Sequence, residues 1–183
     1  MSSRMIIVAV SGGIAAFKTA SLVSRLVQAG HRVEVAMSPS ASQFVGPATF
    51  AALCGSAPAV DIYDPRYPLG AHIELAAAAD ALVIAPATAR VLASCALGLS
   101  DDLISTLYLC MDAPVLMAPA MSDAMWRKTA VQRNVATLRG DGVHLVGPES
   151  GWLSCRRRGE GRMAEPDQIF DAIAELLSGE RPV

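Results

Sequence analysis

The chain has 183 residues, enough for one compact domain with a full hydrophobic core. Apolar residues make up 52% of it and charged residues only 17%, which argues against disorder and suggests that partner subunits cover part of the surface. A formal net charge of -2 excludes a chain held mainly by nucleic-acid phosphates. Its N-terminal apolar stretch is too short for a signal peptide or membrane span, and its 4 cysteines form no C-x-x-C pair. We therefore expect a cytoplasmic protein that binds no membrane and has neither a metal site nor a disulfide framework.

The predicted elements alternate between buried strands and helices. In chain order, the first half predicts a strand at 5–10, a helix at 14–28, a strand at 32–37, a helix beginning at 38–40, a weak strand at 60–62, and a helical stretch after His72. The second half predicts a strand at 81–85 that ends before Pro86, helices at 89–97 and 101–110, and a strand at 114–117. These are followed by a helix at 122–138, a strand at 143–146, a Gly- and Arg-rich loop at 147–163, and a helix at 167–177. This alternation predicts a single α/β domain over residues 1–183, built on a doubly wound parallel sheet.

The turn Ser11-Gly12-Gly13 follows the first predicted strand. Ligands of doubly wound sheets bind at the carboxyl ends of the strands, and these glycines would let the backbone approach a phosphate at the next helix. A tight strand-to-helix turn needs glycine in any case. The turn lacks the pattern G-x-G-x-x-G, and the second predicted strand ends in Ser38 instead of an acidic residue. Both features disfavour a nicotinamide dinucleotide as the ligand, and a mononucleotide with one terminal phosphate is the alternative.

Two further segments could carry chemistry. His72 precedes an alanine-rich helical stretch, and it is either an ordinary surface histidine or an acid/base group beside a ligand. The turn Pro86-Ala87-Thr88-Ala89 offers small side chains, one hydroxyl and free N–H groups at a helix start, which suit a planar ring or a phosphate. The same turn is also compatible with a simple helix cap after a proline.

Segments in the second half of the chain are equally ambiguous. Ser122 could cap a helix in which Met125 and Trp126 belong to the core, or these residues could face a substrate. Cys155 is followed by three consecutive arginines, beginning with Arg156, that would attract an anion or simply solvate a loop.

Together and in this order, the segments resemble the flavin-dependent cysteine decarboxylases, a family with coenzyme A and peptide-modifying branches. The resemblance covers nearly the whole chain. Its markers are Val10–Ala16, His72–Leu75, Ala85–Ala89, Gly98–Leu103, Met117–Met121 with Met125-Trp126, Gly147–Gly151 and Gly161–Pro166.

The resemblance implies a Rossmann-like, flavodoxin-like three-layer sandwich that binds FMN between the subunits of a homotrimer or of a dodecamer built from trimers. It assigns FMN contacts to Gly12, Gly13, Ser38, Phe44, Pro86, Ala87, Thr88 and Ala89. Catalysis falls to His72 and Cys155, and substrate contacts to Ser122, Met125 and Arg156. The implied reaction oxidises the cysteine side chain of the substrate to a thioaldehyde, which then loses carbon dioxide to give an enethiol.

Three positions depart from the family pattern: Arg90 and Ser122 replace asparagines, and Arg156 replaces a glycine. Because a serine hydroxyl cannot reproduce the hydrogen bonds of an amide, we expect an altered substrate. The sequence thus ranks the C-terminal cysteine of a ribosomal precursor peptide first and phosphopantothenoylcysteine second. A non-catalytic flavin-binding regulatory subunit and a flavin prenyltransferase are further alternatives, which His72 and Cys155 disfavour.

Overall fold

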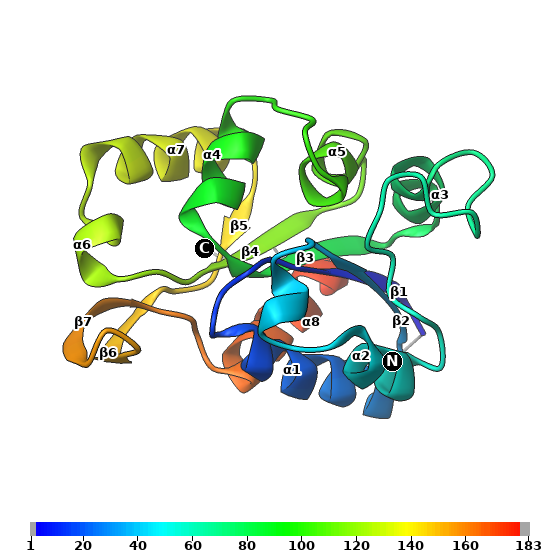
Figure 1. Ribbon diagram of the computed structural model, residues 1–183, viewed down its shortest axis with the longest axis horizontal. Helices are drawn as coiled ribbons and strands as arrows, with labels where there is room; N and C mark the ends of the chain where they lie inside the picture. Colours follow the sequence, from blue (N-terminus) through cyan, green and yellow to red (C-terminus); the bar gives the residue numbers. More distant parts are fainter. Residues whose placement is uncertain (1–2, 180–183) are drawn as a thin grey trace.

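A computed structural model describes residues 3–179 and shows one parallel five-stranded sheet with a separate two-stranded hairpin (Figure 1). The sheet order is β2-β1-β3-β4-β5, so β1 and β3 are neighbours although β2 lies between them in sequence. Its strands are β1 (Met5–Val10), β2 (Arg32–Met37), β3 (Ala81–Ala87), β4 (Val115–Pro119) and β5 (His144–Leu145). This arrangement confirms the predicted doubly wound sheet.

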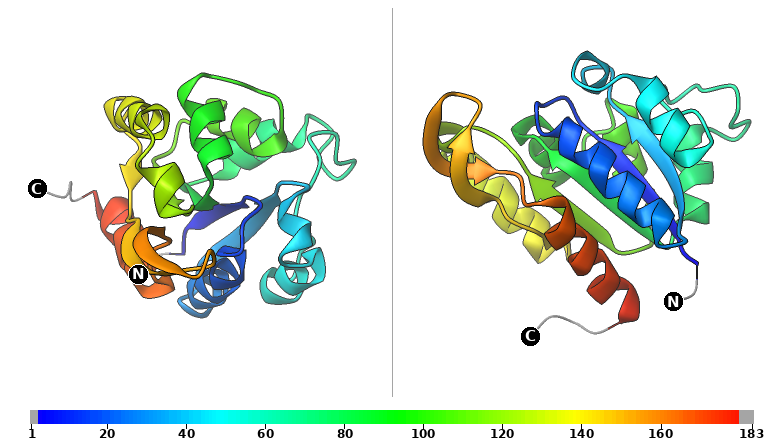
Figure 2. Two further views of the ribbon diagram at one scale, coloured as in Figure 1. Left: turned by 60° about the vertical axis from the view of Figure 1, so that its left-hand side comes forward. Right: turned by 90° about the horizontal axis from the view of Figure 1, so that it is seen from below.

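Helices cover both faces of the sheet (Figures 1 and 2). One face packs against α1 (Ala16–Gln28), α2 (Pro47–Cys54) and α8 (Pro166–Ser178). The other packs against α3 (Ala71–Ala78), α4 (Ala89–Ala96), α5 (Leu103–Leu109) and α7 (Thr129–Gly140). The short helices η1 (Ala41–Gln43) and α6 (Asp123–Trp126) follow β2 and β4.

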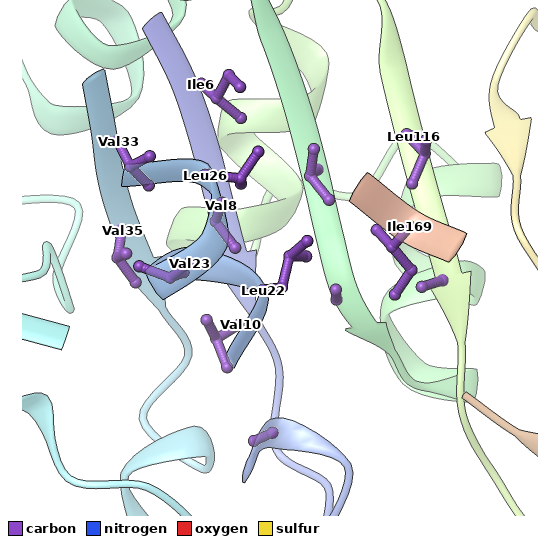
Figure 3. Packing of buried hydrophobic residues seen from close by; sticks show 14 of the residues in the cluster. Ile6, Val8, Val10, Leu22, Val23, Leu26, Val33, Val35, Leu116 and Ile169 are labelled. Atoms are coloured by element: carbon purple, nitrogen blue, oxygen red, sulfur yellow. The ribbon is translucent and has the colours of Figure 1, made fainter. Parts of the chain in front are cut away.

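The alternation of side chains along β1 divides its apolar run between the two faces. Ile6, Val8 and Val10 pack with α1, where Leu22 and Leu26 are fully buried (Figure 3). The intervening Ile7 and Ala9 belong to the cluster on the opposite face. A strand buried on both faces is therefore fixed in register, and its carboxyl end is held in place for the turn that follows.

The Gly- and Arg-rich segment predicted as a loop forms an antiparallel hairpin of β6 (Glu149–Leu153) and β7 (Arg157–Arg162). The loop prediction is wrong because glycines and arginines hide the alternation that marks a strand. The weak strand at 60–62 is also absent, since the Asp61 carboxylate accepts a hydrogen bond from the Tyr63 N–H (2.9 Å) and forms a turn.

Two predicted element boundaries differ from the structure. β3 continues through Pro86 to Ala87, where the prediction ended it. The helix predicted at 122–138 is divided into α6 and α7, because α6 packs on β7 while α7 packs on α4. Within residues 3–179, no helix is long and apolar enough to cross a membrane.

Candidate active site

A serine hydroxyl joins the turns that follow β1 and β3. Ser11 Oγ donates to the Pro86 carbonyl oxygen (2.6 Å), lies 3.2 Å from Thr88 Oγ1, and accepts from the Thr88 N–H (3.3 Å). Ser11 is only 1% exposed, so these bonds lie in a low-dielectric environment where they hold the turns firmly. Ser11 was expected in the turn, but not in this role, and the signal for the role is a polar residue directly after a buried strand.

The turn after β2 lies against the same place. Ser38, 3% exposed, has its Oγ 3.0 Å from Ser40 Oγ. A methyl group at Gly12 would come within 2.3 Å of Ser40 Oγ, so only glycine fits between the turns. The carboxyl ends of β1, β2 and β3 thus meet as predicted for Gly12, Gly13, Ser38 and Thr88.

This edge offers hydrogen-bond donors without protein acceptors. Among the described residues, none accepts a hydrogen bond from the backbone N–H groups of Gly12, Gly13 and Ile14. Thr88 is the N-cap residue of α4, yet its side chain makes no capping hydrogen bond. Successive free N–H groups at a helix start attract an anion, so this donor set fits the phosphate of FMN.

The other predicted cofactor residues divide into exposed and supporting ones. Phe44 is 48% exposed beside the β2 turn and offers an apolar surface for a ring, and Ala89 is partly exposed. Pro86 and Ala87 are buried, and the Ala87 carbonyl accepts from the Ala120 N–H (3.1 Å). These two residues support the turn from beneath, and their contact with the cofactor stays a prediction.

His72 lies in the first turn of α3 rather than in a loop. Its Nδ1 is buried and has no hydrogen-bond partner in the part of the chain that the structure describes. A buried polar nitrogen without a partner is costly, which indicates that a missing group satisfies it. However, α3 packs against α5 and lies on the side of the molecule away from α6 and the hairpin (Figures 1 and 2).

The predicted substrate residues Ser122 and Met125 lie at α6. Ser122 is the N-cap, and its Oγ accepts from the Met125 N–H (3.4 Å). Met125 is 46% exposed, so of its two alternatives the one that puts it in the core does not hold, while Trp126 is partly buried against the core. The capping bond orients the Ser122 hydroxyl toward its own helix.

Cys155 and Arg156 form the turn of the β6–β7 hairpin, and both are exposed. Burial raises the pKa of Cys95 to about 12 and that of Cys54 to about 11, so these two thiols stay protonated at neutral pH. Cys155, like Cys110, is exposed, whereas Cys95 is buried and Cys54 is half-buried. Arg156 has φ +60°, a left-handed conformation that favours the glycine expected there from the family pattern.

Hydrogen bonds from α1 and α8 hold the base of the hairpin in place. Lys18 Nζ donates to the Met163 carbonyl oxygen (3.1 Å) and to the Glu165 carboxylate (2.9 Å), and Arg162 also pairs with Glu165. The Lys18 hydrogen bond is the main reason that the pKa of Glu165 lies below its ordinary value. At the other strand, Gln168 Nε2 donates to Glu149 (2.6 Å).

Arg90, the third departure from the family pattern, points away from the strand-end turns. Its guanidinium donates to Asp101 (3.0 Å) and lies 3.6 Å from the Asp102 carboxylate. This hydrogen bond lowers the pKa of Asp101. Arg90 thus joins the start of α4 to the loop before α5.

Two cavities, of about 300 and 360 Å³, lie away from the strand-end turns. The first lies between α1 and α8 and includes Arg4 and His31, while the second lies between α5 and the start of β4.

The sequence matches the Flavoprotein family over residues 1–178, and the chain belongs to this family. Among its relatives, the coenzyme A biosynthesis bifunctional protein CoaBC of Haemophilus influenzae is 41% identical over 179 residues, which cover 97% of this chain and 45% of that protein. CoaBC of Mycobacterium bovis is 44% identical over 174 residues, 95% of this chain and 41% of that protein. The chain therefore spans a little less than half the length of these relatives.

Solved structures agree with this assignment. The FMN-dependent cysteine decarboxylase SpaF has a TM-score of 0.84 and 33% identity, over 97% of this chain and 96% of that chain. A cysteine-to-serine mutant of PPC decarboxylase, complexed with pantothenoylaminoethenethiol, has a TM-score of 0.88 and 27% identity, over 97% of this chain and 100% of that chain. The predicted resemblance to flavin-dependent cysteine decarboxylases is confirmed.

Proposed function

We propose that this chain is an FMN-dependent decarboxylase that acts on a cysteine conjugate. The observation that carries the proposal is the meeting of the β1, β2 and β3 turns, with unpaired N–H groups at Gly12 and Gly13. An edge of this kind suits a mononucleotide with a terminal phosphate. The family match and the similarity to FMN-dependent decarboxylases support both the cofactor and the reaction class.

Phosphopantothenoylcysteine is the substrate we favour. The sequence departures rank a peptide first, but relatives about 40% identical are coenzyme A biosynthesis proteins, and these support the second candidate better. The solved complex of PPC decarboxylase with an enethiol compound supports the same choice.

Each residue then has a defined task. The N–H groups of Gly12 and Gly13 bind the phosphate of FMN, and Thr88 and Phe44 border its ring. Bound FMN supplies the two-electron oxidation of the substrate cysteine that makes loss of carbon dioxide feasible. His72 holds or moves a proton near the substrate carboxylate, because imidazole exchanges protons near neutral pH. Cys155 donates a proton when the enethiol is reduced to the final thiol.

The active site is completed by a second copy of the chain. Within one protomer α3, which carries His72, lies on the opposite side from α6 and from the β6–β7 hairpin (Figure 1). Large apolar side chains on these elements are exposed, namely Ile73 (47%) on α3, Met125 (46%) on α6 and Trp152 (62%) on β6. A homo-oligomer, either a trimer or a dodecamer of trimers, would bury them and bring His72 to a neighbour's substrate.

A peptide with a C-terminal cysteine is the second candidate. It is favoured by Ser122, whose hydroxyl caps α6 and offers less to a small polar substrate than an amide would. The structural similarity to SpaF also supports this alternative.

Mass spectrometry of the products distinguishes the two candidates. We expect conversion of phosphopantothenoylcysteine to a product lighter by carbon dioxide alone, and Cys155→Ser should release a product lighter by carbon dioxide and two hydrogens. A parent enzyme that ignores this substrate and removes carbon dioxide plus two hydrogens from a Cys-terminated peptide would reverse the ranking. Turnover of neither substrate, with FMN bound, would contradict the decarboxylase proposal.

A further inference from the structure

Three consecutive arginines at the tip of the hairpin have no acidic partner within residues 3–179. Arg156, Arg157 and Arg158 are all exposed, and none of them forms an ion pair with any described residue. Arg90 and Arg127 pair with carboxylates. Arg32, Arg133 and Arg139 also lack an ion pair among the described residues, but they are separated in the sequence, whereas the three hairpin arginines are consecutive. An unpaired cluster of three guanidinium groups in a chain of net charge -2 indicates a site that attracts an anion.

The hairpin register places these arginines on different faces. Arg158 is paired with Trp152, which is 62% exposed, so both belong to the outer face. Arg157 is paired with Leu153, which is only 5% exposed, so it belongs to the face that turns toward the body of the protein.

The inner face of the hairpin packs on α6. A methyl group at Gly159, two residues after Arg157, would lie 2.6 Å from Asp123 Cβ. The Gly161 carbonyl oxygen accepts from the Met121 N–H (2.9 Å). Arg157 therefore shares the face of β7 that packs on α6 and lies two residues beyond Gly159 toward the hairpin tip, and the Asp123 carboxylate beside Gly159 is already paired with Arg127 (3.1 Å).

We propose that Arg157 is a specificity-determining residue that binds the phosphate of a phosphorylated cysteine conjugate. This inference rests on the proposed function and adds the part of the substrate that the chain recognises. A guanidinium group can donate two parallel hydrogen bonds to a phosphate. The ion pair between Lys18 and Glu165 holds the base of the hairpin against the body of the protein. Arg158, on the outer face, carries the same charge without facing α6 and is a matched control.

The experiment compares Arg157→Gln and Arg158→Gln with the parent enzyme on two substrates that differ only in the phosphate. We expect the parent and Arg158→Gln to have kcat/KM for phosphopantothenoylcysteine roughly three- to tenfold above that for pantothenoylcysteine, a range typical of a solvent-accessible charged contact. Arg157→Gln should lose most of this preference through KM, while its kcat on pantothenoylcysteine stays that of the parent. The preference should shrink in high salt because an exposed pair is screened.

A binding measurement separates failure of this inference from failure of the proposed function. Calorimetry with phosphopantothenate and pantothenate, which lack the cysteine, needs no turnover and should show the same dependence on Arg157. If the parent binds both equally, or if Arg157→Gln keeps the preference, the inference is overturned even where decarboxylation is observed. Equal loss in Arg158→Gln would also overturn it, because a diffuse charge effect would then explain the preference.

Discussion

Gly12 and Gly13 are adjacent in the β1 turn but have different surroundings. A methyl group at Gly12 would lie 2.3 Å from Ser40 Oγ and 2.9 Å from the Ser40 carbonyl carbon, whereas one at Gly13 would lie 3.5 Å from Thr88 Cγ2, an ordinary contact. Neither glycine has a left-handed φ. Gly12 is therefore required by the packing of the protein itself, while the space at Gly13 is free for a ligand.

These distances set opposite expectations for two alanine substitutions. Gly12→Ala should lower the free energy of unfolding of the FMN-free protein by about 1–3 kcal/mol, the usual cost of overpacking. Gly13→Ala should leave it unchanged or raise it by up to about 1 kcal/mol, because alanine restricts the unfolded chain. If FMN approaches the backbone here, Gly13→Ala should weaken FMN binding by about tenfold or more, equivalent to about 1.4 kcal/mol.

Urea unfolding of the FMN-free proteins measures the first quantity, and quenching of flavin fluorescence on titration measures the second. The parent protein and Gly12→Ala are the controls for Gly13→Ala. The reasoning is refuted if Gly13→Ala binds FMN as tightly as the parent, or if it destabilises the FMN-free protein as much as Gly12→Ala does.

Three further predictions concern single side chains. Ser11→Ala removes the hydroxyl that joins the β1 and β3 turns and should lower the free energy of unfolding by about 1–3 kcal/mol in urea, so an unchanged midpoint would contradict its role. The hydrogen bond from Lys18 lowers the pKa of Glu165 below 4.5. The pair therefore stabilises the fold above about pH 4.5, and this stabilisation is lost as the pH falls through the lowered pKa and Glu165 becomes protonated. Lys18→Met should flatten that part of the acid-unfolding curve, modestly because Glu165 is partly exposed, and identical curves would count against the pairing. His72→Asn should keep FMN and the oligomer while turnover in steady-state assays falls roughly 10²-fold, and either normal turnover or loss of FMN would exclude the catalytic role.

The parallel sheet and the turns at its strand ends could be predicted because strands buried on both faces have continuous apolar sequences. Residues 5–10 and 81–85 are such runs, and the positions of Gly12, Ser38 and Thr88 follow from the ends of their strands. The part played by Ser11 could not be predicted, because its three hydrogen bonds join residues more than 70 positions apart in the chain.

The hairpin and the divided site could not be predicted from local patterns. Gly151 and Gly159 occupy the inner face of the hairpin, so the apolar alternation that identifies a strand is missing. The order of motifs along the chain says nothing of the distance between His72 and Cys155, and only the family resemblance implied a cofactor bound between subunits. That separation in space is what favours an active site shared between subunits.

The content of flavin in the purified protein tests the central claim most directly. We expect a yellow protein with a flavin absorbance band, which releases about one FMN per chain on denaturation, as a single phosphate site at the β1 turn requires. A colourless protein that takes up no added FMN would contradict the assignment of the strand-end turns and the decarboxylase function built on it.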